Sequence, residues 1–161
     1  METESKVLVV ALKKYLGQYY KAKLKRKQLE VRLKNFREEM VGAKGINYSP
    51  VPSGPTGIST SKTEDYVVRA LEIEDRIMKQ QIEVQRSMLA VMEVMDYLPI
   101  DSVERSVLEY RHIDCLHWEH IPSRMSYSKA SCHKYYNAGI DFLIRCSDVR
   151  ETLQKYVESD R

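Results

Sequence analysis

The spacing of apolar residues in two long segments constrains the fold most strongly. From Lys6 to Val41 they recur every three or four residues, and only Arg26 interrupts the pattern. From about Thr63 to Leu98 a second segment has similar spacing, with Gln81 as its polar interruption. This spacing predicts two long helices that bury apolar stripes against other helices. The stripes comprise Leu8, Leu12, Tyr15, Tyr19, Ala22, Leu29, Leu33, Phe36 and Met40, and then Ile77, Val84, Met88, Val91, Met95 and Leu98.

Residues 42–61 separate the two segments and contain four of the six glycines and three of the five prolines. Proline removes backbone donors and glycine adds chain entropy, so this stretch is expected to be a flexible connector. Thr63 is the expected N-cap of the second helix, and Pro99 ends it. The two helices are therefore predicted to form a long antiparallel, coiled-coil-like hairpin, closed within one chain or between two.

Charge is distributed unevenly along the chain. Residues 6–44 contain twelve Lys and Arg against three acidic residues, a net charge of +9, whereas residues 62–98 contain five against eight, a net of −3. Opposite charge favours pairing of the two helices, although a basic segment also suits nucleic acid or a membrane surface. Residues 101–146 contain six of each sign and are neutral overall.

Residues 99–161 are expected to form a second domain after a hairpin domain of residues 1–98. "DSVERSVLEYRHI" (101–113) predicts a helix of about three turns, and "HWEHIPSRM" (117–125) predicts a shorter one, which Pro122 shortens or bends. Ser126 and Tyr127 then form a tight turn, Ser128 caps the next helix, and residues 147–161 form a charged tail. Two helices joined by a three-residue turn are typical of a helix-turn-helix, so the predicted fold class is all-α.

The two faces of this motif have different compositions. A side chain that packs inward is expected at each position where the helical spacing repeats an apolar residue. The inward positions of the first helix are Trp118, Ile121 and Met125, and Tyr127 is expected to plug the turn. Those of the second helix are Cys132, Tyr135, Gly139, Ile140 and Leu143. The remaining side chains of the second helix point away together and suit phosphates and base edges of double-stranded DNA. The candidate DNA-binding residues are Lys129, Ala130, Ser131, His133, Lys134 and Asn137.

Cysteines and histidines near this motif raise the alternative of a metal site. Cys115, His117 and His120 do not have the paired spacing of familiar zinc sites. Cys132 falls on the buried face and the adjacent His133 on the exposed one, so the two cannot converge on one ion. We therefore expect neither a metal nor a cofactor. No catalytic residue is expected either, because the sequence contains no recognisable triad, carboxylate pair or glycine-rich phosphate loop.

The segment "LEYRHIDCLHWEHIPSRMSYSKASCHKYYNAGIDFL" (108–143) resembles the C-terminal part of phage ArpU/RinA-type late transcriptional regulators, and also sigma-factor region 4. "YLGQYYKAKLKRKQLE" (15–30) and "INYSPVPSGP" (46–55) resemble the rest of that family, so the resemblance covers nearly the whole chain. Pro122 departs from the family pattern, as does the stretch from His133 to Tyr136. The resemblance implies a sequence-specific regulator that activates late phage genes for packaging, structure and lysis.

The leading expectation is thus a DNA-binding transcription activator. One motif specifies few base pairs, so a homodimer or larger oligomer, or a tether to host RNA polymerase, is expected to add specificity. A small-terminase-type DNA-packaging protein and a helical adaptor that does not bind DNA remain open alternatives. With no apolar run near 18 residues, no cleavable leader and three cysteines, we expect no membrane association and a location in the cytoplasm of a bacterial host.

Overall fold

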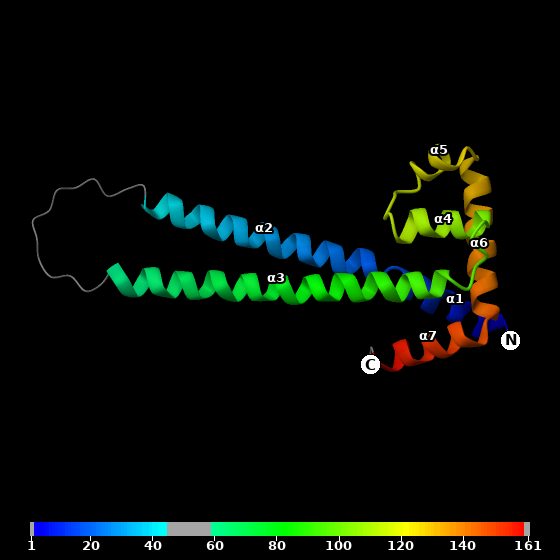
Figure 1. Ribbon diagram of the computed structural model, residues 1–161, viewed down its shortest axis with the longest axis horizontal. Coiled ribbons are helices and arrows are strands. Elements are labelled where there is room, and N and C mark those ends of the chain that lie inside the picture. Colours follow the sequence, from blue (N-terminus) through cyan, green and yellow to red (C-terminus); the bar gives the residue numbers. More distant parts are fainter. Residues whose placement is uncertain (1, 45–58, 160–161) are drawn as a thin grey trace, which may run out of the picture. The chain divides into compact units, whose positions relative to one another are not determined.

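The computed structural model describes residues 2–44 and 59–159, which form α-helices and no strand. The predicted all-α class is therefore confirmed for the described residues. Figure 1 shows the helices in chain order. They are α1 (Glu2–Leu16), α2 (Gln18–Lys44), α3 (Ser59–Met95), α4 (Val103–His112), α5 (Ile121–Met125), α6 (Lys129–Arg145) and α7 (Ser147–Ser159).

The chain divides into two compact units, one of which is residues 23–83. In this unit α2 and α3 pack side by side in opposite directions, so the predicted antiparallel hairpin is confirmed and closes within one chain (Figure 1). Most of the connector predicted for residues 42–61 lies outside the described residues. The predicted helix start at Thr63 was wrong, because α3 already begins at Ser59.

Stacked rings and paired polar groups hold α2 against α3. Leu33 is buried, and the ring of Phe36 stacks on that of Tyr66 with centroids 4.4 Å apart, while the Tyr66 hydroxyl donates to the Phe36 carbonyl at 2.8 Å. Arg26 and Gln81, the two polar interruptions of the apolar stripes, form a hydrogen bond with each other. A buried polar group without a partner destabilises a fold, so this pairing allows both residues to occupy the seam.

The single long helix predicted for residues 6–41 was wrong, because the chain turns at Gly17 between α1 and α2. A Cβ atom at this position would lie 3.3 Å from the carbonyl oxygen of Lys13, which is tighter than most such contacts. Glycine also has a low helix propensity, so it favours the interruption. The part of the predicted stripe that lies on α1 therefore does not belong to the hairpin. Instead, α1 packs on α6 and α7.

The second unit joins residues 1–22 to residues 84–161, so the predicted domain boundary after residue 98 was wrong. Apolar side chains from α1 and the end of α3 share one core with α4–α7, which explains why this unit includes both ends of the chain. The rings of Tyr15 and Tyr156, for example, meet edge to face with centroids 5.0 Å apart. The core comprises Leu12, Tyr15, Leu16, Val91, Val94, Met95, Leu98, Val107, Leu108, Ile121, Cys132, Tyr136, Ile140, Leu143, Val149 and Leu153.

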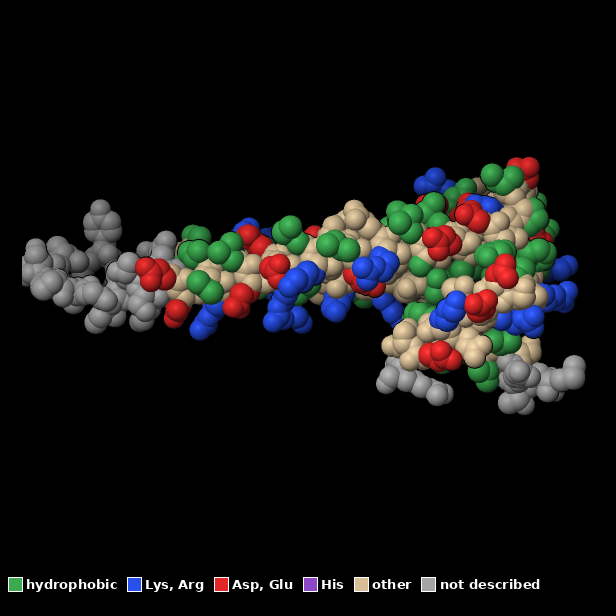
Figure 2. All heavy atoms as spheres, turned by 60° about the horizontal axis from the view of Figure 1, so that its bottom comes forward, with side chains coloured by type: hydrophobic (Ala, Val, Ile, Leu, Met, Phe, Trp, Pro, Cys, Tyr) green, Lys and Arg blue, Asp and Glu red, His purple; other side chains and the backbone are tan. Residues whose placement is uncertain are grey.

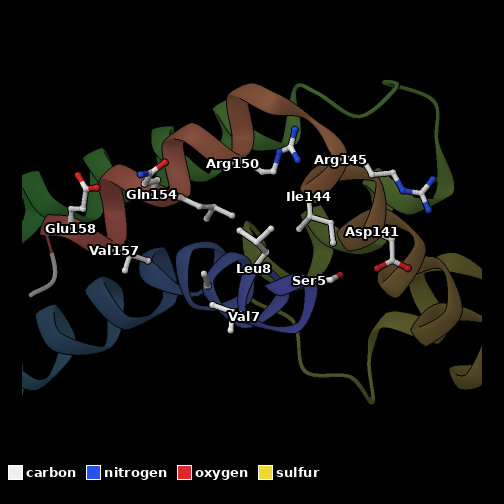
Figure 3. Close-up of a pocket in the computed structure, with 12 residues that line it drawn as sticks. Ser5, Val7, Leu8, Asp141, Ile144, Arg145, Arg150, Gln154, Val157 and Glu158 are labelled. Carbon is white, nitrogen blue, oxygen red and sulfur yellow. The ribbon is translucent and has the colours of Figure 1, made fainter. Parts of the chain in front are cut away.

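The charged tail predicted for residues 147–161 is instead largely the helix α7, whose Val149 and Leu153 are buried. A groove of about 900 Å³ lies between α7, α1 and α6. Leu8 and Ile144 are among the side chains that line it (Figure 3). Asp141 and Arg145 bring opposite charges to this groove, which therefore favours neither an anion nor a cation. Within the described residues, no helix combines the length and apolar character needed to cross a membrane.

Gly139 allows α4 and α6 to approach closely. A Cβ atom there would lie 2.7 Å from Leu108 Cδ1 and 3.3 Å from Glu104 Cβ. We expect Gly139→Val to lower the free energy of unfolding by about 1–3 kcal/mol, because the added methyl groups push the two helices apart. Ala138→Val, at an exposed position of the same helix, is the matched control. Denaturant unfolding of both variants is the measurement, and equal stabilities would contradict the close approach.

Candidate nucleic-acid interface

Local sequence signals position α4, α5 and α6. Ser102 caps α4 by accepting a hydrogen bond from the Arg105 backbone N–H at 3.2 Å, and Ser128 caps α6 in the same way from Ser131 at 3.1 Å. The predicted Ser128 cap is confirmed, as is the shortened first helix. Because Pro122 occupies the first turn of α5, that helix starts only at Ile121 and has five residues.

The turn between α5 and α6 is tight. Ser126 closes α5 in the left-handed region, with φ of 58°, and the Tyr127 backbone N–H donates to the Pro122 carbonyl at 3.3 Å. Non-glycine residues adopt this conformation rarely, and usually in such turns. The turn ends at Ser128, so three residues separate the last residue of α5 from the first of α6.

Most of the side chains predicted to pack inward do so. Ile121, Cys132 and Ile140 are buried, and Trp118 and Met125 are partly buried against the same core. Tyr127, predicted to plug the turn, was wrongly placed: it is 41% exposed and its ring contacts that of Tyr135, with centroids 5.3 Å apart. Tyr135 is only partly buried. The fully packed tyrosine is Tyr136, four residues after Cys132 rather than three.

The six candidate DNA-binding residues lie on the first three turns of α6, away from its buried face. Lys129, Ala130, Lys134 and Asn137 are exposed. Ser131 and His133 are half-buried. The Ser131 side chain belongs to the helix cap, because its Oγ accepts a hydrogen bond from Ser128 Oγ at 2.9 Å.

His133 is one member of an aromatic cluster that borders this face. Its ring stacks on that of Trp118 with centroids 4.0 Å apart, and the Tyr136 ring meets Trp118 edge to face at 5.1 Å. The Arg111 guanidinium lies over Trp118 at 5.7 Å from the ring centroid, and Lys13 Nζ lies over Tyr136 at 5.6 Å. Cation–π contacts of this kind hold the two cations near the exposed face of α6.

These side chains surround a cavity of about 480 Å³ beside α6. Its lining combines cationic groups, amide and imidazole donors, and aromatic rings, a composition suited to phosphate oxygens and the edges or faces of bases. Of these lining residues, only His133 and Asn137 were predicted from the sequence to bind DNA. The other lining residues are Lys13, Gly17, Tyr20, Arg111, His112, Cys115, His117, Trp118 and Tyr136.

His112 connects three helices beneath the cavity. The side chain is buried, and its Nε2 lies 3.0 Å from the Tyr136 hydroxyl. Burial, with a smaller contribution from Arg111, lowers the pKa of His112 to about 4, and a hydrogen bond with the Leu16 backbone acts in the opposite direction. His112 is therefore neutral at pH 7, and serves the packing of α1 on α4 and α6.

Acidification is expected to destabilise the protein through His112. Its pKa falls from 6.5 in the unfolded chain to about 4 in the folded one, so the unfolded state binds the proton more tightly. The stabilisation is complete above pH 6.5 and is lost as the pH falls toward 4, by about 3 kcal/mol. Denaturant unfolding between pH 7 and 4 measures this loss. His112→Gln should show a smaller pH dependence, whereas His117→Gln, at an exposed position, should retain that of the wild type; identical profiles for all three would contradict the assignment.

The cysteine and histidine side chains near α6 do not form a metal-binding arrangement. Cys132 points into the core, where burial raises the pKa of its thiol, whereas the adjacent His133 stacks on Trp118. Across the described residues, no three His, Cys, Asp or Glu side chains group together in a way that could hold a metal ion. The Cys132 thiol thus belongs to the packing of α6.

No family model matches the chain, and no curated protein or solved structure is significantly similar to it.

Proposed function

We propose that α5 and α6 form a helix-turn-helix and that the protein binds double-stranded DNA through the exposed face of α6. One observation supports this most directly: Lys129, Lys134 and Asn137 are exposed together on a helix whose opposite face is buried. A three-residue turn and a short helix precede α6, as in motifs that insert the second helix into the major groove.

Each exposed side chain of α6 suits a chemical role in this arrangement. Lys129 and Lys134 supply charge to phosphates, which fixes the position of the protein on the duplex. Asn137 offers a paired donor and acceptor that match adenine in the major groove, and Ala130 suits contact with a thymine methyl group. Ser131 and His133 are further hydrogen-bonding groups for base edges or phosphates on the same face.

Cations from other helices add to the charge of this face. Residues 101–146 are neutral overall, so α4–α6 alone attract a polyanion weakly. Lys13 of α1 lines the cavity beside α6, and Arg111 of α4 lines it as well. Both cations would contact backbone phosphates at the edge of the DNA major groove. They therefore extend the proposed DNA-binding surface beyond α6.

We further propose that the protein is a phage-encoded transcriptional regulator that activates late genes in the cytoplasm of a bacterial host. The resemblance of residues 108–143 to ArpU/RinA-type regulators and to sigma region 4 supports this role. Specificity on a genome requires more than one short helix, so a homodimer or larger oligomer, with host RNA polymerase as a second partner, completes the proposal.

Selection of bound duplexes from a random DNA pool tests the proposal. We expect one enriched sequence motif, a footprint on it upstream of a phage promoter, and affinity that falls steeply with salt. Binding without an enriched motif by a ring-shaped oligomer would instead indicate DNA packaging. Absence of any duplex binding at low salt would overturn the proposed function. The remaining alternative would then be a helical adaptor that does not bind DNA.

A further inference from the structure

One face of α3 is apolar yet exposed. Hydrophobic side chains are visible at intervals along the hairpin, beside charged ones (Figure 2). On α3 six of them recur in steps of three, four or seven residues, and each is between 43% and 69% exposed. We call these residues the outer stripe of α3: Val68, Leu71, Met78, Ile82, Leu89 and Met92.

The outer stripe lies opposite a buried one on the same helix. Ile82 precedes the buried Val84 by two residues, and Leu89 precedes the buried Val91 by two. Two residues correspond to about 200° around an α-helix, so the two stripes face in opposite directions. An amphipathic helix needs only one apolar face to pack in a hairpin. The outer stripe is therefore an apolar face that the packing of α3 in the hairpin does not require.

Two polar residues occupy the outer stripe where its spacing predicts apolar ones. Asp75 falls between Leu71 and Met78, and Gln85 falls between Ile82 and Leu89. With these two included, the stripe steps regularly by three and four from residue 68 to residue 92, the spacing of a coiled-coil seam. A polar residue within such a seam specifies its register and orientation.

We propose that the outer stripe binds the outer stripe of a second copy of this chain, with the two α3 helices antiparallel and crossing near residue 80. Each layer then pairs two residues whose numbers add to 160. Leu71 packs on Leu89 of the second copy, and Val68 packs on Met92. At the centre Met78 packs on Ile82, and the two polar positions meet, Asp75 opposite Gln85.

The polar positions select this arrangement. A Gln85 amide donates a hydrogen bond to the Asp75 carboxylate of the second copy, whereas a parallel pair in register would place two Asp75 carboxylates together. Sliding the antiparallel pair by one heptad would place Asp75 against Met78 or Met92. Either register buries a charged group against an apolar one, which disfavours it.

Charges beside the stripe agree with the same register. Glu72 lies on the flank that faces Arg86 of the second copy, and this favourable contact occurs twice by symmetry. Lys79 approaches Lys79 of the second copy across the axis, but in each chain its Nζ lies 2.7 Å from an Asp75 oxygen, which offsets the repulsion. The paired stripe spans about 36 Å at 1.5 Å per residue.

Disrupting the stripe tests the interface. The proposal concerns α3 alone and does not rest on DNA binding. We expect the wild-type chain to sediment as a dimer and Leu71→Glu/Ile82→Glu to sediment as a monomer of unchanged helix content. Leu24→Glu/Val31→Glu, at exposed apolar positions of α2, is the matched control and should remain dimeric. A monomeric wild type, or a dimeric Leu71→Glu/Ile82→Glu variant, would overturn the proposal.

Disulfide cross-linking tests the register. With oxidised glutathione as oxidant, Leu71→Cys/Leu89→Cys should form a covalent dimer whose linked peptides contain residues 71 and 89, identified by mass spectrometry. The two positions lie about five turns apart on one helix, so they cannot link within a chain. Leu71→Cys alone is the control for a parallel pair. A disulfide that joins position 71 of one copy to position 71 of the other, or no link between positions 71 and 89, would overturn the antiparallel arrangement.

Discussion

The Lys129→Ala/His133→Ala/Lys134→Ala variant is expected to bind its duplex site about 100-fold more weakly than the wild type. Two phosphate contacts are lost, so the dependence of log affinity on log salt should also become shallower by about two. Fluorescence anisotropy between about 50 and 200 mM salt measures both changes. Lys129 and Lys134 are exposed, and the half-buried His133 lies outside the core, so helix content should not change.

A basic surface elsewhere provides the control for this variant. Lys25→Ala/Lys27→Ala removes two exposed cations from α2 and should leave the affinity within about twofold of the wild type, because α2 is assigned to the hairpin. The control also decides whether the basic N-terminal segment contacts DNA. A triple variant with wild-type affinity, or a control with the larger loss, would refute the assignment of α6 as the DNA-binding helix.

Cys132→Asp is expected to unfold the unit formed by residues 1–22 and 84–161 at neutral pH. The Cys132 side chain is fully buried among apolar neighbours, and a carboxylate there would have no partner. Leaving a charge unpaired in a core costs about 3–5 kcal/mol, a large part of the stability of a small domain. Circular dichroism with denaturant titration is the measurement.

The Cys132→Val variant tests whether the core needs the thiol group of Cys132 or only an apolar side chain at this position. Valine fills the position without charge, so this variant should retain the wild-type fold and DNA affinity, with a stability change below about 1.5 kcal/mol. Elemental analysis of protein purified without added metal completes the experiment. Stoichiometric zinc in the wild type that disappears in Cys132→Val would show that Cys132 is a metal ligand and would overturn its role in packing.

Features that depend on neighbouring residues could be predicted from the sequence. Ser128 caps α6 because its hydroxyl accepts the N–H three residues ahead, and Pro122 shortens α5 because proline is favoured only in a first turn. The hairpin of α2 and α3 likewise follows from the spacing of apolar residues within each helix. In these cases the determinants lie within a few residues of the feature.

Features that depend on packing between distant segments could not be predicted. The apolar spacing of α1 continues into α2, so nothing in the periodicity showed that the chain turns at Gly17 and that Leu12 and Leu16 enter the other unit. Tyr135 was predicted as the buried tyrosine in place of Tyr136, because residues three and four positions after Cys132 both approach its face. Tyr136 is the buried tyrosine because its side chain contacts Trp118 and His112.

The cavity beside α6 was missed for the same reason. Its cations Lys13 and Arg111 come from α1 and α4, about 100 residues apart in the chain. Only after α1 is placed in the unit with α6 do these side chains border one surface. The stacking of His133 on Trp118 also joins α6 to the turn that precedes α5, and no shared periodicity relates the two, so the spacing within α6 could not reveal it.

The division of one core between the two ends of the chain has a consequence for folding. Leu12, Tyr15 and Leu16 are synthesised first, but the residues that bury them begin after Val84. Closing the intervening segment, Lys23–Glu83, costs about 3.6 kcal/mol of chain entropy if that segment is a flexible loop. Prior formation of the α2–α3 hairpin shortens the effective loop and reduces this cost. Early formation of the hairpin therefore favours the docking of α1 on the rest of its core. Weakening the hairpin should slow this docking more than it lowers the stability of the folded core.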